Sequence, residues 1–393
     1  MDGIRSMKSK IYMSDYSVDM PYIDGYKNQR DWINFDRDNL FPQRIINMAN
    51  ESPLQNSILS NKIKYICGAG IADYDASIYT PNLTEDWFSL IKKCVVDYVY
   101  TGAFAIQAIM NEDGNKFSYF HQPVAQVRMG QYNDNNQIEK YFICADWRKG
   151  IRNKSIVEIK AFGVETPKKG EPYLMYFKEY KPDELYYAIP GWFSGANWIL
   201  ADIALSKYYL NFIKNNFSAN LSINYPTEPT EDKKEELYEA LQASFGGESN
   251  AGNILLLFGE NGVAPTIQNI ESVDADLYNS VTDVVLKYIV AANRLTSPIL
   301  AGLATSSGFS SKSDEIIAAY TQYKLTVIDE DRNFILDKIN FLLQLNGYPR
   351  VLEIKDYDIR KEFEGQTAQN DAVEAEVTDT NNNELKDADN AEK

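Results

Sequence analysis

A long apolar segment, ANWILADIALSKYYLNFIKNNF at residues 196–217, constrains the fold of this chain more than any other stretch. It contains neither proline nor glycine, and an α-helix of this length, rising about 1.5 Å per residue, would extend roughly 33 Å. Its apolar side chains cover much more than the stripe of about 100° that a surface helix buries. We therefore predict that this helix packs against more than one neighbour. A deep core and an interface between subunits would both satisfy it, and the sequence alone leaves both open.

Two more helical patterns flank a loop of small residues, GLATSSGFSSKSD. The pattern before the loop, residues 274–295, has one apolar face. The pattern after it, residues 311–348, is the longest in the chain, and its β-branched centre LTVIDEDR predicts a kink or a boundary. A phosphate-binding loop would need G-x-x-x-x-G-K-[ST]. Five residues separate Gly302 from Gly308 instead of four, and Phe309 stands where the lysine is required, so this is not a P-loop.

The first half of the chain predicts helices followed by a β-rich region. Residues 34–71 and 84–100 have helical patterns, and Thr84 is the expected N-cap of the second pattern. AFAIQAIM and FSYFHQ read as two strands of a hairpin whose turn is NEDGNK. Short alternating segments continue to residue 190, which indicates a β-rich module with short turns.

The second half contains a compact β-α-β pattern over residues 220–271, in which Thr230 caps a helix at 230–247. Residues 350–359 predict a terminal strand. Residues 362–393 then hold ten acidic residues and two lysines, a net charge of −8. Since such a segment cannot bury enough apolar surface to offset the entropy of ordering, we expect it to be disordered.

Charge and composition exclude several classes of function. The net charge of −17 argues against a protein that coats nucleic acid, because neutralising phosphates takes lysine and arginine. Cys67, Cys94 and Cys144 form no C-x-x-C motif and predict buried thiols in a reducing compartment. The one histidine, His121, cannot build a metal site of the usual His/Cys kind, and we expect it to be structural. No signal-peptide core is recognisable and no apolar run approaches the ~20 residues of a membrane span, so we expect a soluble intracellular protein.

Four stretches of the sequence, in a fixed order, carry a resemblance to a known family. They are DNLFPQRIINMANESPLQNSILSNKIKYICGAG, DYVYTGAFAIQAIMNEDGNKFSYFHQPVAQVR, FSANLSINYPTEP with the helix and strands that follow it, and NRLTSPILAGL with GFSSKSDEIIAAYTQYKLTVIDEDRNFILDKIN. Together they span nearly all of residues 34–348. In order and in motifs they resemble the portal proteins of tailed double-stranded DNA bacteriophages, of the long-tailed phage type.

This resemblance implies an α+β, portal-like fold that assembles into a dodecameric ring. It divides the chain into an N-terminal arm at 1–33, a β-rich wing at 34–195, a first stem helix at 196–217, a small β-α-β clip at 218–272, a second stem helix at 273–295, a tunnel-loop region at 296–313, a long helix and C-terminal strand at 314–361 in the wing or crown, and the acidic tail at 362–393.

The resemblance also implies a structural role. The ring would occupy one vertex of the capsid, and double-stranded DNA would be packaged and ejected through its centre. The implied partners are further copies of the chain, the DNA, the terminase large subunit, the major capsid protein with its scaffold, and a head–tail connector or adaptor protein. The location would be the virion, with the host cytoplasm during assembly. Neither an enzymatic activity, a cofactor, a metal nor a membrane is implied.

Three groups of residues would carry these roles. The tunnel loop would face the DNA with small, hydroxylated or longer side chains: Thr305, Ser306, Ser307, Phe309, Ser310, Ser311 and Lys312. The clip would dock partners through Glu231, Lys233, Lys234, Glu235 and Glu239. The stem helices would pack against neighbouring subunits through Ile203, Tyr208, Phe212, Val284 and Tyr288.

Two other functions stay open at this point. The chain could be another self-assembling virion or scaffold protein that carries no DNA, in which case the loop at 302–313 is an ordinary surface connection. It could also be a phosphate-handling enzyme that uses the serine- and glycine-rich loop, although the sequence offers no P-loop, no histidine pair and no metal cluster.

Overall fold

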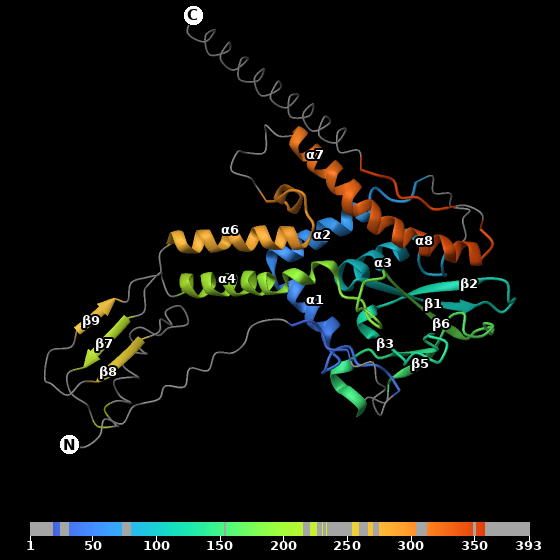
Figure 1. The fold of residues 1–393 in the computed structure, drawn as a ribbon, viewed down its shortest axis with the longest axis horizontal. Coiled ribbons are helices and arrows are strands. Elements are labelled where there is room, and N and C mark those ends of the chain that lie inside the picture. Colours follow the sequence, from blue (N-terminus) through green and yellow to red (C-terminus); the bar gives the residue numbers. More distant parts are fainter. Residues whose placement is uncertain are drawn as a thin grey trace, which may run out of the picture. The chain divides into compact units, whose positions relative to one another are not determined.

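The structure is a computed structural model. It describes residues 19–23, 31–72, 80–152, 155–214, 221–225, 230, 233, 254–258, 266–269, 275–303, 313–348 and 351–357 (Figure 1). The described chain divides into two compact units. The helix-pair unit comprises residues 50–54 and the described part of 194–289, and the sheet unit comprises the described parts of 19–49, 55–193 and 290–357.

The sheet unit is built around a six-stranded sheet with the strand order β2-β1-β6-β5-β4-β3. All neighbouring strands are antiparallel except β5 and β6, which are parallel. The strands are β1 (Ala103–Met110), β2 (Phe117–Gln122), β3 (Val127–Met129), β4 (Lys140–Ile143), β5 (Val157–Ala161) and β6 (Pro172–Lys178). The predicted hairpin is confirmed, since β1 pairs with β2 in the register Ile106↔His121 and Gly114 adopts the positive φ of 74° that its turn requires.

Helix α3 (Trp87–Thr101) shows how the sequence pattern becomes packing. Apolar residues three and four positions apart are buried along one face, as predicted. The predicted cap is wrong, however: Asp86 is the N-cap, and its side chain accepts a hydrogen bond from the Ser89 backbone N–H. Thr84 instead donates its hydroxyl to the side chain of Asn82, at 2.8 Å. Because the Thr84 hydroxyl is engaged by Asn82, the N-cap lies two residues later than expected.

Three other helical segments belong wholly or mainly to the sheet unit. They are α1 (Phe41–Glu51), α2 (Pro53–Cys67) and a long helix made of α7 (Ser313–Tyr323), a π-helical segment (Lys324–Ile328) and α8 (Asp329–Leu345). The kink or boundary predicted near 325–332 is thus a change of helix type inside a continuous helix. Figure 1 shows α7 and α8 in line with each other.

The predicted terminal strand is wrong for the residues that the structure describes. Only Ile354 pairs, in an isolated antiparallel bridge to Ile71. Backbone bonds of 2.8 Å, from Ala72 N–H to the Glu353 carbonyl and from Lys355 N–H to the Gly70 carbonyl, flank it. The partner is the short turn after α2, which is too brief to extend a ladder.

A buried arginine fastens the segment before α1 to the sheet. Arg128 is fully buried in β3, and its guanidinium donates to the Asn39 carbonyl at 2.6 Å and to the Val127 carbonyl at 2.7 Å. The same group lies 4.8 Å from the ring centroid of Trp147. Burial lowers the pKa of Arg128 to about 10. Its hydrogen bonds go to neutral oxygens, so this cation is held by dipoles and an aromatic ring.

The helix-pair unit contains α4 (Ala196–Lys214), most of α6 (Ala275–Ala292) and a small sheet. The sheet has the order β8-β7-β9, with β7 (Leu221–Tyr225) parallel to β8 (Ile254–Phe258) and antiparallel to β9 (Thr266–Asn269). A parallel pair requires a crossover connection, and the helix predicted at 230–247 lies between these strands. Of that predicted helix the structure describes only Thr230, the expected cap, which is exposed and not helical, and Lys233, which is helical; the rest lies outside the described residues.

Candidate functional site

Helices α4 and α6 lie side by side and form a close pair (Figure 1). The rings of Trp198 and Tyr288 stack with their centroids 4.4 Å apart and their planes within 7°. Both helices also carry buried aliphatic side chains: Ile199 and Ile203 from α4, and Val285 and Ile289 from α6. Burial of these residues accounts for one apolar face of each helix.

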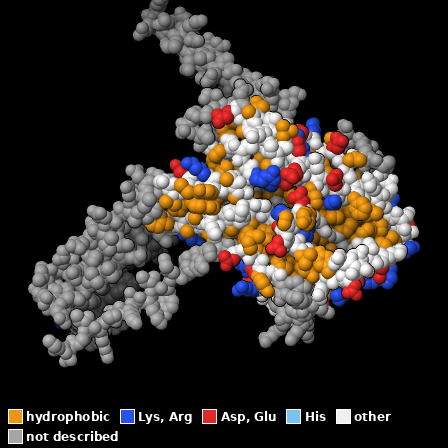
Figure 2. All heavy atoms as spheres, viewed as in Figure 1, with side chains coloured by type: hydrophobic (Ala, Val, Ile, Leu, Met, Phe, Trp, Pro, Cys, Tyr) orange, Lys and Arg blue, Asp and Glu red, His pale blue; other side chains and the backbone are white. Residues whose placement is uncertain are grey.

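Other apolar side chains of the pair stay exposed. They are 36% to 52% exposed, and we call them the outer helix-pair surface: Tyr208, Tyr209, Leu210, Val281, Val284 and Tyr288. Figure 2 shows apolar side chains gathered over these helices. A contiguous group of exposed apolar side chains often marks an interaction site. That 196–217 packs against more than one neighbour stays a prediction, because the described residues cover only part of the apolar surface of α4.

The residues predicted for stem packing divide between these two faces. Ile203 is buried, whereas Tyr208, Val284 and Tyr288 belong to the outer helix-pair surface. The side chain of Phe212 lies outside the described residues. The predicted set did not include Tyr209, Leu210 and Val281; Val281 could have been found from its spacing of three residues from Val284.

The pair is also fastened to the connection between α1 and α2. Asp202 on α4 accepts a hydrogen bond of 2.6 Å from the Ser52 hydroxyl and lies 3.5 Å from the Leu54 backbone N–H. Lys207 of α4 lies 3.7 Å from the Glu51 carboxylate. Ser52 and Leu54 thus bind α4, the first helix of the pair, through its Asp202 side chain.

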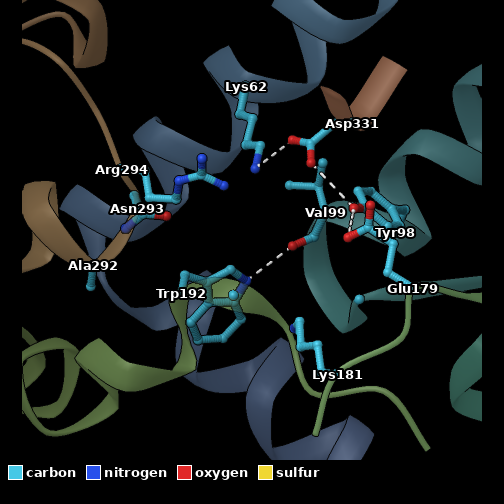
Figure 3. A pocket seen from close by; sticks show the side chains of 12 residues that line it. Lys62, Tyr98, Val99, Glu179, Lys181, Trp192, Ala292, Asn293, Arg294 and Asp331 are labelled. Carbon is cyan, nitrogen blue, oxygen red and sulfur yellow. Dashed lines mark hydrogen bonds and ion pairs between the residues drawn. The ribbon is translucent and has the colours of Figure 1, made fainter. Parts of the chain in front are cut away.

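The sheet unit contains a polar cavity of about 110 Å³ (Figure 3). Lys62 of α2 makes an ion pair of 2.7 Å with Asp331 of α8, and Trp192 donates its indole N–H to the Val99 carbonyl at 3.0 Å. The Tyr98 hydroxyl lies 2.9 Å from a Glu179 oxygen and 3.2 Å from an Asp331 oxygen. Burial, Asp331 and Glu179 together raise the pKa of Tyr98 well above its usual value. A tyrosine held protonated between carboxylates donates a hydrogen bond and is a poor nucleophile.

Other reactive side chains of the described residues are held in unreactive forms. Burial raises the pKa of Cys67 to about 11 and raises that of Cys94 as well, so these thiols stay protonated. His121 lies 3.0 Å from Asp97, whose carboxylate also accepts the Val124 backbone N–H at 2.8 Å. That pair joins β2 to α3, consistent with a structural histidine. In the described part of the chain no three His, Cys, Asp or Glu side chains converge as metal ligands.

The other predicted site residues are not placed by the structure. The tunnel-loop candidates, Thr305 to Lys312, lie outside the described residues, as do Glu231, Lys234, Glu235 and Glu239 of the clip. Lys233 is described and exposed. Within the described ranges, no helix has the length and hydropathy of a membrane span.

Comparison with known proteins identifies the fold. No protein-family model and no curated protein matches the sequence. A chain in the neck of an empty gene transfer agent (GTA) particle, computed with C6 symmetry, matches with a TM-score of 0.54 and 14% identity, over 83% of this chain and 89% of that chain. A chain in the virion of the native GTA particle matches with a TM-score of 0.52 and 14% identity, over 86% and 90%. An HK97 family phage portal protein from Corynebacterium diphtheriae also matches, with a TM-score of 0.42 and 10% identity, over 69% and 84%.

The fold is therefore one found in gene transfer agent particles, once in the neck and once in the virion, and the likeness covers most of this chain. This likeness in fold accords with the resemblance that the sequence motifs indicate.

Proposed function

We propose that this chain is a phage portal protein that forms a closed ring at one vertex of the capsid. The carrying observation is the outer helix-pair surface, an exposed apolar face on a fold found in particle necks. One of the similar neck structures was computed with C12 symmetry. In a ring of about twelve copies, each copy would place this surface against a different surface of the next copy.

The ring would be a conduit for double-stranded DNA. The loop at 302–313 would line its narrowest part through the hydroxyl groups of Thr305, Ser306, Ser307, Ser310 and Ser311, with Phe309 and Lys312 as the longer side chains. Small hydroxylated groups can face a moving polyanion without strong ion pairs, and the net charge of −17 likewise disfavours tight binding of a duplex.

The role is structural, without a catalytic site. The clip at 218–272 would dock the terminase large subunit and the connector through its charged helix, and the sheet unit would contact the capsid protein and scaffold. Particles would carry the protein in the virion after assembly in the host cytoplasm.

Deletion of residues 303–311 tests the conduit role in a packaging system that uses this chain. We expect rings of unchanged mass and particles that fail to package or retain DNA. Unchanged packaging would refute the channel role and would favour a self-assembling virion protein without a DNA channel. A matched deletion of similar length in the acidic tail, residues 376–384, controls for shortening of the chain.

A further inference from the structure

The π-helical segment Lys324–Ile328 joins α7 to α8 without interrupting the helix. Tyr323 before it and Asp329 after it both have α-helical backbone angles, with φ of −62° and −67°. A π-turn accommodates one residue more than an α-helical turn. The side chains of α7 consequently point in directions that are rotated from those of an unbroken α-helix continuing α8.

This rotation decides which side chains of α7 are buried. Counting back in steps of three and four leads from buried Ile328 to Leu325 and Thr321, and from buried Val327 to Tyr323 and Tyr320. Tyr323 and Tyr320 are buried, and Leu325 is 67% exposed. The buried face of α7 therefore continues from Val327 and not from Ile328.

Two side chains from the segment after α6 bind the continuous α7–α8 helix, one before the π-segment and one within it. Arg294 donates to the Thr326 carbonyl at 3.0 Å, inside the π-segment, and its other nitrogen lies 3.4 Å from Glu330. Thr296 donates its hydroxyl to the Ala319 carbonyl of α7 at 2.8 Å. Arg294 has a φ of 55°, in the left-handed region that few residues other than glycine adopt. A strained backbone of this kind persists where its surroundings hold it, and here it aims the guanidinium at the π-turn.

The segment that carries these two residues is itself firmly placed. Ser57 of α2 donates to the Ala301 carbonyl at 2.7 Å, and Asn61 donates to the Leu300 carbonyl at 3.1 Å. The carbonyls belong to the 3-10 turn Pro298–Ala301, four residues after Arg294. Arg294 and Thr296 therefore extend from a fixed base toward the long helix.

The buried tyrosines make the observed orientation of α7 less stable in one respect. The hydroxyls of Tyr320 and Tyr323 are both buried and make no hydrogen bond within the described part of the chain. Buried hydroxyls without partners destabilise the arrangement that contains them. The two hydrogen bonds from Arg294 and Thr296, which hold the helix in this arrangement, act in the opposite direction.

We propose that Arg294 and Thr296 are positioning residues that clamp the helix in its π-containing phase. Without the clamp the segment relaxes to α-helix, α7 turns by about 100° and shifts by about 1.5 Å relative to α8, and Leu325 turns inward. Since α7 directly follows the 302–313 region, its phase sets the direction in which that region leaves the helix. This last consequence rests on the proposed function, whereas the phase itself does not.

Thiol labelling reads the phase directly. A cysteine replaces Leu325, and an Asn333→Cys variant on the exposed side of α8 is the matched control. The native cysteines are all buried and give a low background. With Arg294 intact, both introduced thiols should react at similar rates. With R294A, the thiol at 325 should react about fivefold or more slowly relative to the thiol at 333, because it becomes buried.

An unchanged ratio of the two rates would overturn the proposal, and so would faster labelling at 325, which would indicate fraying instead of rotation. T296V, which keeps the shape of the side chain and removes only the donor, should cause a smaller slowing in the same direction. If circular dichroism shows that R294A does not fold, T296V supplies the comparison. Labelling requires neither ring assembly nor DNA. A negative labelling result would therefore leave the proposed function standing, and failure of the proposed function would leave the clamp proposal standing.

Discussion

The helix-pair unit and the sheet unit treat their side chains in opposite ways. In the sheet unit, charged groups that enter the interior meet partners from the same unit, as Lys62 does with Asp331 and Arg332 with Asp356. In the helix-pair unit, one apolar face is buried and the outer helix-pair surface is left to solvent. Most buried charges of the sheet unit thus find partners inside the unit, whereas apolar side chains of the helix pair stay exposed among the described residues. We expect the outer helix-pair surface to bind a partner, and the following changes would break or sharpen that contrast.

The largest effect is expected for assembly. V284D with Y288D places two carboxylates on the outer helix-pair surface, where burial in an interface would be strongly unfavourable. Each apolar side chain removed from such an interface loses about 1.5–3 kcal/mol, so the dissociation constant between copies should rise more than about a hundredfold. Mass photometry should show loss of the large particle.

Tyr180 provides the matched control, because it is 88% exposed and lies in the sheet unit. Y180D should leave the particle intact. If V284D with Y288D also leaves the mass unchanged, the outer helix-pair surface is not the interface and the contrast between the units loses its meaning.

Breaking the ion pair in the cavity should give the next largest effect. K62M leaves the Asp331 carboxylate, which is 7% exposed, buried without its cation. Removing one partner of a buried pair destabilises by about 3–5 kcal/mol. Urea unfolding measures this loss in the free energy of unfolding. The double variant K62M with D331L should recover much of the loss. Equal losses in the single and the double variant would mean that the pair is not coupled.

Arg128→Met tests whether the sheet unit depends on its buried arginine. The change strands the oxygens of Asn39, Ala125 and Val127 that the guanidinium satisfies. We expect a loss of about 2–3 kcal/mol in the free energy of unfolding, since hydrogen bonds to charged groups are among the stronger ones. Arg148, whose side chain is 74% exposed, should tolerate the same substitution with little change.

The smallest effect should be a pH-dependent one at Asp356. Burial acts to raise the pKa of this carboxyl, but hydrogen bonds and charges from Arg332 and Lys324 outweigh it, so the pKa lies below the usual 3.8. A lowered pKa means stability that is present above pH ~4 and lost as the pH falls through the folded value. The side chain is 45% exposed, so after allowing for screening we expect D356N to lose only about 0.5–1 kcal/mol at pH 7. Melting curves of the two proteins should converge below about pH 3, and a difference that persists there would exclude the ion pair as its cause.

Local patterns in the sequence predicted much of the fold. The apolar spacing of α3, the β1–β2 hairpin and the multi-sided helix at 196–217 were all readable, because each follows from periodicity within one segment. The Thr84 cap was wrong because a local hydrogen bond to Asn82 engages the threonine hydroxyl. The terminal strand was wrong because its pairing depends on a distant segment, and of its described residues only Ile354 pairs, with Ile71.

The candidate site was less accessible from the sequence. Which of the apolar faces of α4 would be covered depends on α6, about 80 residues away, so Ile203 and Tyr208 could not be told apart. The cavity joins Lys62, Tyr98 and Asp331 from three separate helices. The β-branched centre of the last helix did signal an irregularity, but only the structure identifies it as a π-turn held by Arg294.

The most direct test of the proposed ring is the mass of the purified protein in solution, combined with negative-stain images. About twelve copies of 44.8 kDa would give a particle near 540 kDa with an annular projection and an open centre, which is the result we predict. A stable dimer or tetramer with a two-fold axis would contradict the account, because such an assembly would satisfy the outer helix-pair surface without forming a channel.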